Sequence, residues 1–201
     1  MTDYLTPAGE TTTELEIKRS QFITFLARAE NRQQALDYIQ SVRDKHPQAR
    51  HVCWAYIAGA PDTTVLSMSD DGEPSGTAGR PMLAALQHSG LGEVVAAVVR
   101  YFGGIKLGTG GLQRAYSDAV VQTLAECQTL LKRQMGSFNV IVDYSHEQVL
   151  RRSLEEVSGQ LVACNYSEHV QAEVVVPVDL TEQWQTLLTN LTAGNISIKN
   201  S

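Results

Sequence analysis

The sequence predicts an α+β protein built of two domains. Its 201 residues, 43% of them hydrophobic, suffice for two packed cores. Segments with apolar residues at every second position are interspersed with segments whose apolar residues recur at helical spacing. The polar stretch KRQMGS at 132–137 separates two such series. We therefore predict one domain over residues 1–134 and a second over residues 135–201.

Local periodicity predicts the first elements of the first domain. Residues 11–28 alternate apolar and polar side chains with one break, which predicts two strands or one bent strand. Residues 31–46 carry their apolar side chains on one helical face. Residues 51–59 and 63–69 predict two strands, and the connection between them is short enough for a hairpin.

A loop, a short helix and a buried strand follow. The loop DDGEPSGTAGRP (70–81) is rich in turn-forming residues. Pro81 suits the first position of a short helix, and Gly90 suits its end. Residues 93–102 are nearly all apolar and rich in β-branched side chains, which is typical of a central strand covered on both faces.

The segment RYFGGIKLGTGGLQRAY (100–116) leads from that strand into a helix. Behind its glycines, apolar residues recur at helical spacing: Leu112, Ala115, Tyr116, Ala119 and Val120. We predict that this helix runs to about Leu131 and that residues 132–137 link the two domains.

The second domain has the order strand, helix, strand, strand, helix, strand. This order is typical of the ferredoxin-like split βαβ fold. The predicted elements span 138–142, 146–158, 161–166, 170–178, 179–192 and 195–199.

Composition and charge exclude several functional classes. The net charge is −6, and residues 136–201 hold eight acidic against three basic residues, so we expect no DNA binding and no general polyanion surface there. No apolar run is long enough to cross a bilayer, and the first residues lack a secretory pattern. Three separated cysteines fit a reducing compartment. We expect a cytoplasmic protein without membrane association, disordered over about its first ten residues.

The glycine-rich segment matches neither common nucleotide-binding signature. Gly108 is followed by Thr109 rather than the lysine of a P-loop, and Gln113 stands where a dinucleotide fingerprint needs glycine. A helix that begins after glycines still presents unpaired N–H groups that attract anions, with Lys106 close by. The alternative is that the glycines only allow the helix to pack closely on the sheet.

The acidic loop also has more than one interpretation. Asp70, Asp71 and Glu73 suggest a divalent cation, but they lack the alternating spacing of a calcium loop. Turn chemistry explains the same residues without a metal. The carboxylates could instead pair with a cation such as Arg100 and hold the two loops together.

His51 and Cys53 raise the question of a Cys–His nucleophile, because both side chains lie on the same strand face. A cysteine in the middle of an apolar strand is more often a small buried hydrophobe. The second domain also lacks the aromatic strand signature of an RNA-recognition motif. We assign no catalytic residue.

Two long motifs, DDGEPSGTAGRPML (70–83) and VVRYFGGIKLGTGGLQRAY (98–116), resemble the signature of the IMPACT family. KRSQFI (18–23) and HVCWAY (51–56) also fit its pattern. The resemblance implies a first domain similar to the second domain of ribosomal protein S5. It implies a ferredoxin-like second domain similar to the last domain of elongation factor G. Eukaryotic members similar in this core regulate translation through a partner protein.

We therefore expect a non-catalytic, translation-associated regulator that binds RNA or a ribosome-associated protein through residues 70–80 and 103–111, without cofactor or metal. On the glycine-rich side the expected binding residues are Arg100, Lys106, Gly108, Thr109, Gly110, Gly111 and Arg114. The second loop contributes Asp71, Gly72, Glu73, Gly76 and Thr77. A metal-dependent enzyme acting on a nucleotide or phosphoester and a purely protein-binding module stay open as alternatives, as does the oligomeric state.

Overall fold

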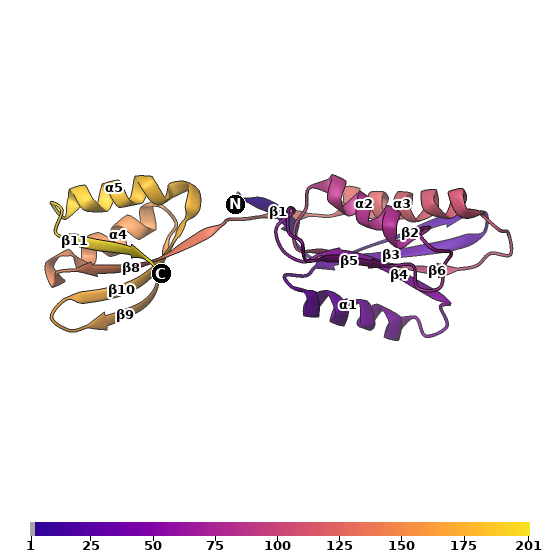
Figure 1. Ribbon diagram of the computed structural model, residues 1–201, viewed down its shortest axis with the longest axis horizontal. Helices are drawn as coiled ribbons and strands as arrows, with labels where there is room; N and C mark the ends of the chain where they lie inside the picture. The colour runs from indigo at the N-terminus through magenta and orange to yellow at the C-terminus, as the bar shows by residue number, and fades with distance from the viewer. Residues whose placement is uncertain (1–2) are drawn as a thin grey trace. The chain divides into compact units, whose positions relative to one another are not determined.

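The computed structural model describes residues 3–201, which form an α+β structure of two compact units (Figure 1). One unit comprises Tyr4–Lys132, and the other comprises Arg133–Ser201 together with Asp3. Each unit has its own hydrophobic core, as the two series of apolar patterns predicted.

The larger unit contains a fully antiparallel five-stranded sheet whose central strand is the apolar segment predicted to lie there. All residues of that strand are buried except its last, because helices cover both faces of the sheet. In spatial order the strands are β2 (Thr11–Ile17), β3 (Ser20–Arg28), β6 (Val94–Tyr101), β4 (His51–Ile57) and β5 (Leu66–Ser69).

Three helices cover the two faces of this sheet (Figure 1). One face packs against α1 (Arg32–Lys45), and the other packs against α2 (Gly79–Ser89) and α3 (Thr109–Glu126). Helix α2 ends as predicted at Gly90, whose φ of 70° is left-handed. It begins two residues before Pro81.

The prediction for the end of α3 was wrong. The helix stops at Glu126, and Thr129–Lys132 form strand β7 instead, paired antiparallel with β1 (Tyr4–Pro7). The expected disorder of the first ten residues is therefore wrong for β1, while residues 1–2 lie outside the described residues. The pairing joins segments more than 120 residues apart, so local periodicity could not reveal it.

The smaller unit has the predicted ferredoxin-like order. Its sheet has the antiparallel strand order β11-β8-β10-β9, and both helices pack on one face (Figure 1). Trp184 of α5 is fully buried in its core. Residues 135–137, expected in a linker, already belong to β8. Its elements are β8 (Met135–Val142), α4 (Glu147–Glu156), β9 (Gln160–Tyr166), β10 (Val170–Pro177), α5 (Thr181–Leu191) and β11 (Ile196–Asn200).

Two connections meet where β4 begins and β6 ends, in the interior of the larger sheet. The antiparallel register of β4 and β6 places His51 opposite Arg100, so the start of β4 lies beside the end of β6. We call residues 70–80, which join β5 to α2, the acidic loop. Residues 103–111, which join β6 to α3 and include its first turn, form the glycine-rich loop.

Candidate functional site

Asp70 organises the acidic loop. Its Oδ2 accepts a hydrogen bond from Gly76 N at 2.7 Å, and its Oδ1 accepts from Ala78 N at 2.9 Å and Gly79 N at 2.8 Å. The carboxylate thereby caps the first turn of α2, where a negative charge is favourable. Burial alone would raise the pKa of Asp70, but these backbone hydrogen bonds outweigh it and lower the pKa.

The carboxylate of Asp71 is also fully engaged inside the protein. Its Oδ2 accepts a hydrogen bond from Val52 N at 2.7 Å, and its Oδ1 lies 2.9 Å from Nη2 of Arg43 on α1. His51 Nδ1 donates to the Asp71 carbonyl at 2.8 Å. Asp71 therefore ties the acidic loop to β4 and α1.

Glu73 joins the acidic loop to the central strand and to α3. Its Oε1 accepts from Arg100 Nη1 at 2.7 Å and from the Tyr116 hydroxyl at 2.8 Å. The side chains of Glu73 and Arg100 are only 4% and 8% exposed. The pairing of an acidic-loop carboxylate with Arg100, one of the alternatives drawn from the sequence, is thus observed. Through this one oxygen, Glu73 joins the acidic loop to both β6 and α3.

Arg100 keeps unused hydrogen-bonding capacity despite its burial. Its guanidinium carbon lies 5.6 Å from the ring centroids of both Phe22 and Phe102, within the range of a cation–π contact. Its buried Nε has no hydrogen-bond partner in residues 3–201. A buried N–H without an acceptor costs free energy, which an anionic acceptor would recover.

The glycines of the glycine-rich loop serve different purposes. A side chain at Gly103 would overlap the Arg19 carbonyl in the β2–β3 turn, so close packing requires glycine there. Gly104 and Gly108 have φ of 86° and 75°, a left-handed conformation that favours glycine. At Gly110 neither reason applies, because φ is not positive and an added Cβ would meet no atom within 4 Å. The interpretation that this glycine serves close packing is therefore wrong.

The first turn of α3 is chemically open. The N–H of Leu112 bonds to the Gly108 carbonyl, whereas no described acceptor pairs with the N–H groups of residues 109–111. No side chain caps this end. The exposed Lys106 lies in the loop just before it and forms no ion pair with any described residue. Bare N–H groups at a helix N-terminus together with a lysine favour anion binding.

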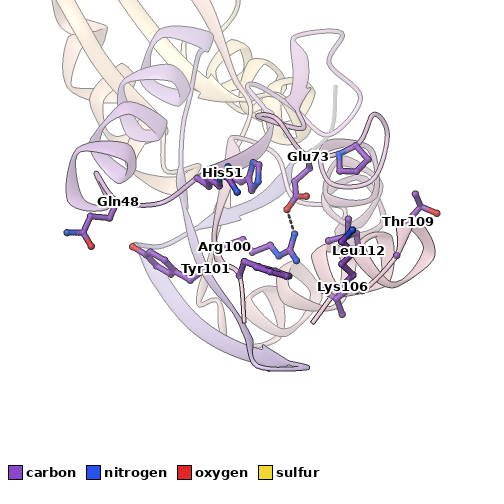
Figure 2. A pocket seen from close by; sticks show the side chains of 13 residues that line it. Gln48, His51, Glu73, Arg100, Tyr101, Lys106, Thr109 and Leu112 are labelled. Carbon is purple, nitrogen blue, oxygen red and sulfur yellow. Dashed lines mark hydrogen bonds and ion pairs between the residues drawn. The ribbon is translucent and has the colours of Figure 1, made fainter. Parts of the chain in front are cut away.

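A pocket of about 520 Å³ lies between the acidic loop, the glycine-rich loop and the end of β6 (Figure 2). Three cationic side chains and one carboxylate line it, an excess of two positive charges in a chain whose net charge is −6. The glycine-rich loop supplies one side and the α1–β4 connection supplies another. Its lining residues are Gln48, Arg50, His51, Glu73, Pro74, Arg100, Tyr101, Phe102, Lys106, Leu107, Gly108, Thr109 and Leu112.

The structure brings together some of the expected binding residues and leaves others apart. Glu73, Arg100, Lys106, Gly108 and Thr109 line the pocket. The remaining ones do not line it: Asp71, Gly72, Gly76, Thr77, Gly110, Gly111 and Arg114.

The expected residues outside the pocket have identifiable roles or exposed positions. Thr77 is buried and donates to the Pro74 carbonyl at 2.6 Å, so it stabilises the turn. Gly72 packs beside the His51 ring. Arg114 is exposed on α3 and forms no ion pair with Asp118 in the described structure.

Four residues that line the pocket were not predicted from the sequence. They are Gln48 and Arg50 of the α1–β4 connection, and Tyr101 and Phe102 at the end of β6. Arg50 directly precedes His51, whose strand partner is Arg100, so recognising the antiparallel pairing of β4 and β6 would have found it. Phe102 continues the central strand by one residue, and its side chain is 57% exposed. A large exposed aromatic residue directly after a buried strand is the signal that was available.

Cys53 is not set up as a nucleophile. The Cys53 thiol donates its single proton to the Asp70 carbonyl at 3.0 Å, and its Sγ lies 3.4 Å from the Tyr116 hydroxyl, while His51 bonds to the Asp71 carbonyl. Burial raises the pKa of the Cys53 thiol to about 12. The thiol therefore stays protonated at neutral pH and behaves as a buried core group.

Family comparisons cover both units. The model of the Impact N-terminal domain matches residues 18–124, which contain both loops and the whole pocket lining. A domain of unknown function (DUF1949) matches residues 140–195. No helix within residues 3–201 is long and apolar enough to span a bilayer.

Similar proteins extend over nearly the whole chain. IMPACT family member YigZ of Escherichia coli (strain K12) is 40% identical over 98% of each chain. An IMPACT family member of Haemophilus influenzae is 39% identical over 99% of this chain and 97% of that protein. A crystal structure described only as that of a hypothetical protein matches with a TM-score of 0.77 and 39% identity, covering 100% of this chain and 98% of the other.

Proposed function

Because the chain belongs to the IMPACT family, we propose that it is a translation-associated protein that binds RNA without catalysing a reaction on it. The binding surface would be formed by the acidic and glycine-rich loops. The observation that carries this proposal is the pocket's excess of two positive charges beside the unpaired N–H groups of residues 109–111. In this mechanism the backbone N–H groups and Lys106 capture RNA phosphates, and Arg100 contributes from the pocket lining.

The acidic loop supports this proposal better than it supports a metal-dependent enzyme. Asp71 is paired with Arg43, and Glu73 is paired with Arg100. No group of three potential metal ligands occurs in the part of the chain that the structure describes. In the proposed role these carboxylates hold the acidic loop in place and position Arg100.

One observation favours protein binding as a second candidate. Phe102, directly after β6, and Ile105 of the glycine-rich loop expose 57% and 42% of their surface. Exposed apolar side chains of this kind also occur at protein interfaces. A ribosome-associated protein is therefore the alternative partner that a binding experiment must separate from RNA.

The test measures the affinity of the purified protein for single-stranded RNA at several salt concentrations. Lys106→Ala is expected to weaken binding about equally for all sequences, because phosphate contacts carry no base information. It should also reduce the slope of log K against log salt by about 0.7, the value for one lost contact. Lys199→Ala, the same charge change on the exposed end of β11, is the matched control and should leave the slope unchanged.

RNA affinity that Lys106→Ala and Gly110→Val both leave unchanged, in protein shown to be folded, would contradict the proposed function. If these two variants leave RNA affinity unchanged and the protein still associates with ribosomes, the result would favour the protein-binding candidate.

A further inference from the structure

Four segments of the larger unit line the pocket. Its walls come from the α1–β4 connection, the acidic loop, the end of β6 and the glycine-rich loop. Its volume of about 520 Å³ lies in the range that encloses one small molecule. Single strands bound along a groove occupy several nucleotides. The volume of the pocket therefore suits a single nucleotide, such as one at the end of an RNA, better than several nucleotides within a strand.

A buried cation, Arg100, lines the pocket, and part of its guanidinium group lacks an acceptor. The Arg100 side chain is 8% exposed, and Glu73 engages only its Nη1. Glu73 Oε1 also accepts from Tyr116, so this single oxygen is shared between two donors. Arg100 Nε is buried without an acceptor in the described structure. Figure 2 shows the guanidinium directed toward Glu73, with Lys106 and Thr109 on the neighbouring loop.

The charge of the lining distinguishes between types of phosphate. Arg50, Arg100 and Lys106 line the pocket together with one carboxylate, Glu73, which leaves two positive charges in excess. A phosphodiester within a strand carries one negative charge, whereas a terminal phosphate monoester carries nearly two at neutral pH. Thr109, the first residue of α3, also lines the pocket, and its unpaired N–H adds a further donor. The excess of two positive charges in the pocket therefore matches the charge of a terminal phosphate monoester.

Phe102 offers a surface for a base. One side of its ring faces the Arg100 guanidinium, and its side chain is 57% exposed. Stacking of a base on an aromatic ring contributes about 1–3 kcal/mol and tolerates any base. Phe102 therefore lies next to Arg100, so a base could stack on the ring while the phosphate of the same nucleotide contacts the guanidinium.

We propose that this pocket binds a single nucleotide bearing a terminal phosphate monoester, with the phosphate on Arg100, Lys106 and the α3 N-terminus and the base on Phe102. The inference deepens the proposed function and rests on it, because it names the part of an RNA that the site recognises. A phosphorylated RNA end and a free nucleoside monophosphate share this chemistry.

The experiment compares ligands that differ only in the terminal phosphate. Binding is measured for a single-stranded RNA of about ten nucleotides with a 5′-phosphate, a 3′-phosphate or hydroxyls at both ends. Adenosine 5′-monophosphate, inorganic phosphate and a phosphoserine peptide complete the set. We expect a terminal phosphate to strengthen RNA binding about tenfold, and adenosine 5′-monophosphate to compete for the site.

Two exposed positions provide variants that leave the core intact. Lys106→Gln should remove most of the preference for a terminal phosphate, whereas Lys199→Gln should keep it. Phe102→Ala should weaken adenosine 5′-monophosphate about tenfold while changing inorganic phosphate little. Equal losses for both ligands would remove the stacking role of Phe102 and overturn the nucleotide assignment.

The outcomes separate this inference from the proposed function. Equal affinity for phosphorylated and hydroxyl-ended RNA overturns the inference and leaves RNA binding in place. Binding of adenosine 5′-monophosphate without RNA binding supports the pocket's ligand and overturns the proposed function. Tighter binding of the phosphoserine peptide than of any nucleotide overturns the nucleotide assignment. Absence of binding to every ligand overturns both.

Discussion

The acidic loop and the glycine-rich loop, which meet beside the ends of β4 and β6, differ in how completely the protein satisfies their polar groups. In the acidic loop, Asp70, Asp71 and Glu73 all accept hydrogen bonds from the backbone or from neighbouring side chains. In the glycine-rich loop, the N–H groups of residues 109–111 have no acceptor among the described residues, and Lys106 is exposed.

This difference assigns different tasks to the two loops. A loop whose carboxylates are all engaged contributes to stability and to the position of Arg100. The glycine-rich loop has donors without described acceptors and a glycine that packing does not require, Gly110, so in the proposed function it is the loop that binds the ligand. Substitutions in the acidic loop should therefore change stability, and substitutions in the glycine-rich loop should change affinity.

The largest expected effect concerns Cys53, which the acidic loop covers through the Asp70 carbonyl. Burial raises the pKa of this thiol to about 12, so its thiolate fraction at neutral pH is about a thousandfold below that of an ordinary cysteine. Iodoacetamide should label Cys164 long before Cys53 in native protein, as peptide mass analysis would show. Rapid, selective labelling of Cys53 would contradict the scaffold role of the acidic loop.

Asp70→Asn should destabilise the larger unit by about 3 kcal/mol, because a carboxylate that accepts three backbone hydrogen bonds is lost. Urea unfolding measures the change. Asp62→Asn, at an exposed position after β4, is the matched control and should change stability by less than about 0.5 kcal/mol. A similar small change for Asp70→Asn would show that the carboxylate does not organise the loop.

Glu93 provides a second engaged carboxylate, remote from the loops. It accepts hydrogen bonds from Tyr4 at 2.9 Å, from Arg28 at 2.8 Å and from Lys132. Burial alone would raise the pKa of Glu93, but the bonds from Lys132, Arg28 and Tyr4 outweigh it and lower the pKa. Glu93→Gln should cost about 2 kcal/mol at neutral pH.

The pH dependence of this effect has a definite sign. A carboxylate whose pKa is lower in the folded state stabilises the fold above its unfolded pKa of about 4.3. That stability is lost as the pH falls through the lower, folded pKa. The difference in unfolding free energy between the parent protein and Glu93→Gln should therefore shrink below about pH 4. A difference that stays constant from pH 7 to pH 3 would contradict the lowered pKa.

Strong local patterns predicted most of the fold. The buried run 93–102 predicted the central strand because an apolar β-branched segment has no other favourable place in such a sheet. Strand β7 was not predicted, because its residues pair with β1 near the other end of the unit's sequence. The early start of α2 was missed because its cap, Asp70, lies eight residues before Ala78.

The candidate site was predicted only in part, for the same reason. Composition and spacing identify Lys106 and the glycines, which lie together in the chain. Arg50 and Phe102 join them only through the antiparallel register of β4 and β6. The ion pair of Asp71 with Arg43 could not be predicted either, since Arg43 lies on α1, a helix on the other face of the sheet.

The most direct test of the division between the loops is Gly110→Ala, measured for both stability and RNA affinity. Alanine is the better helix former, and the added Cβ would meet no atom within 4 Å, so unfolding should cost about 0.5–1 kcal/mol more than in the parent protein. The same methyl group covers the bare N–H groups at the start of α3, so RNA should bind several-fold more weakly. Higher stability with weaker binding is the predicted result. Higher stability with unchanged binding would contradict the account, because the exposed backbone would then have no part in recognition.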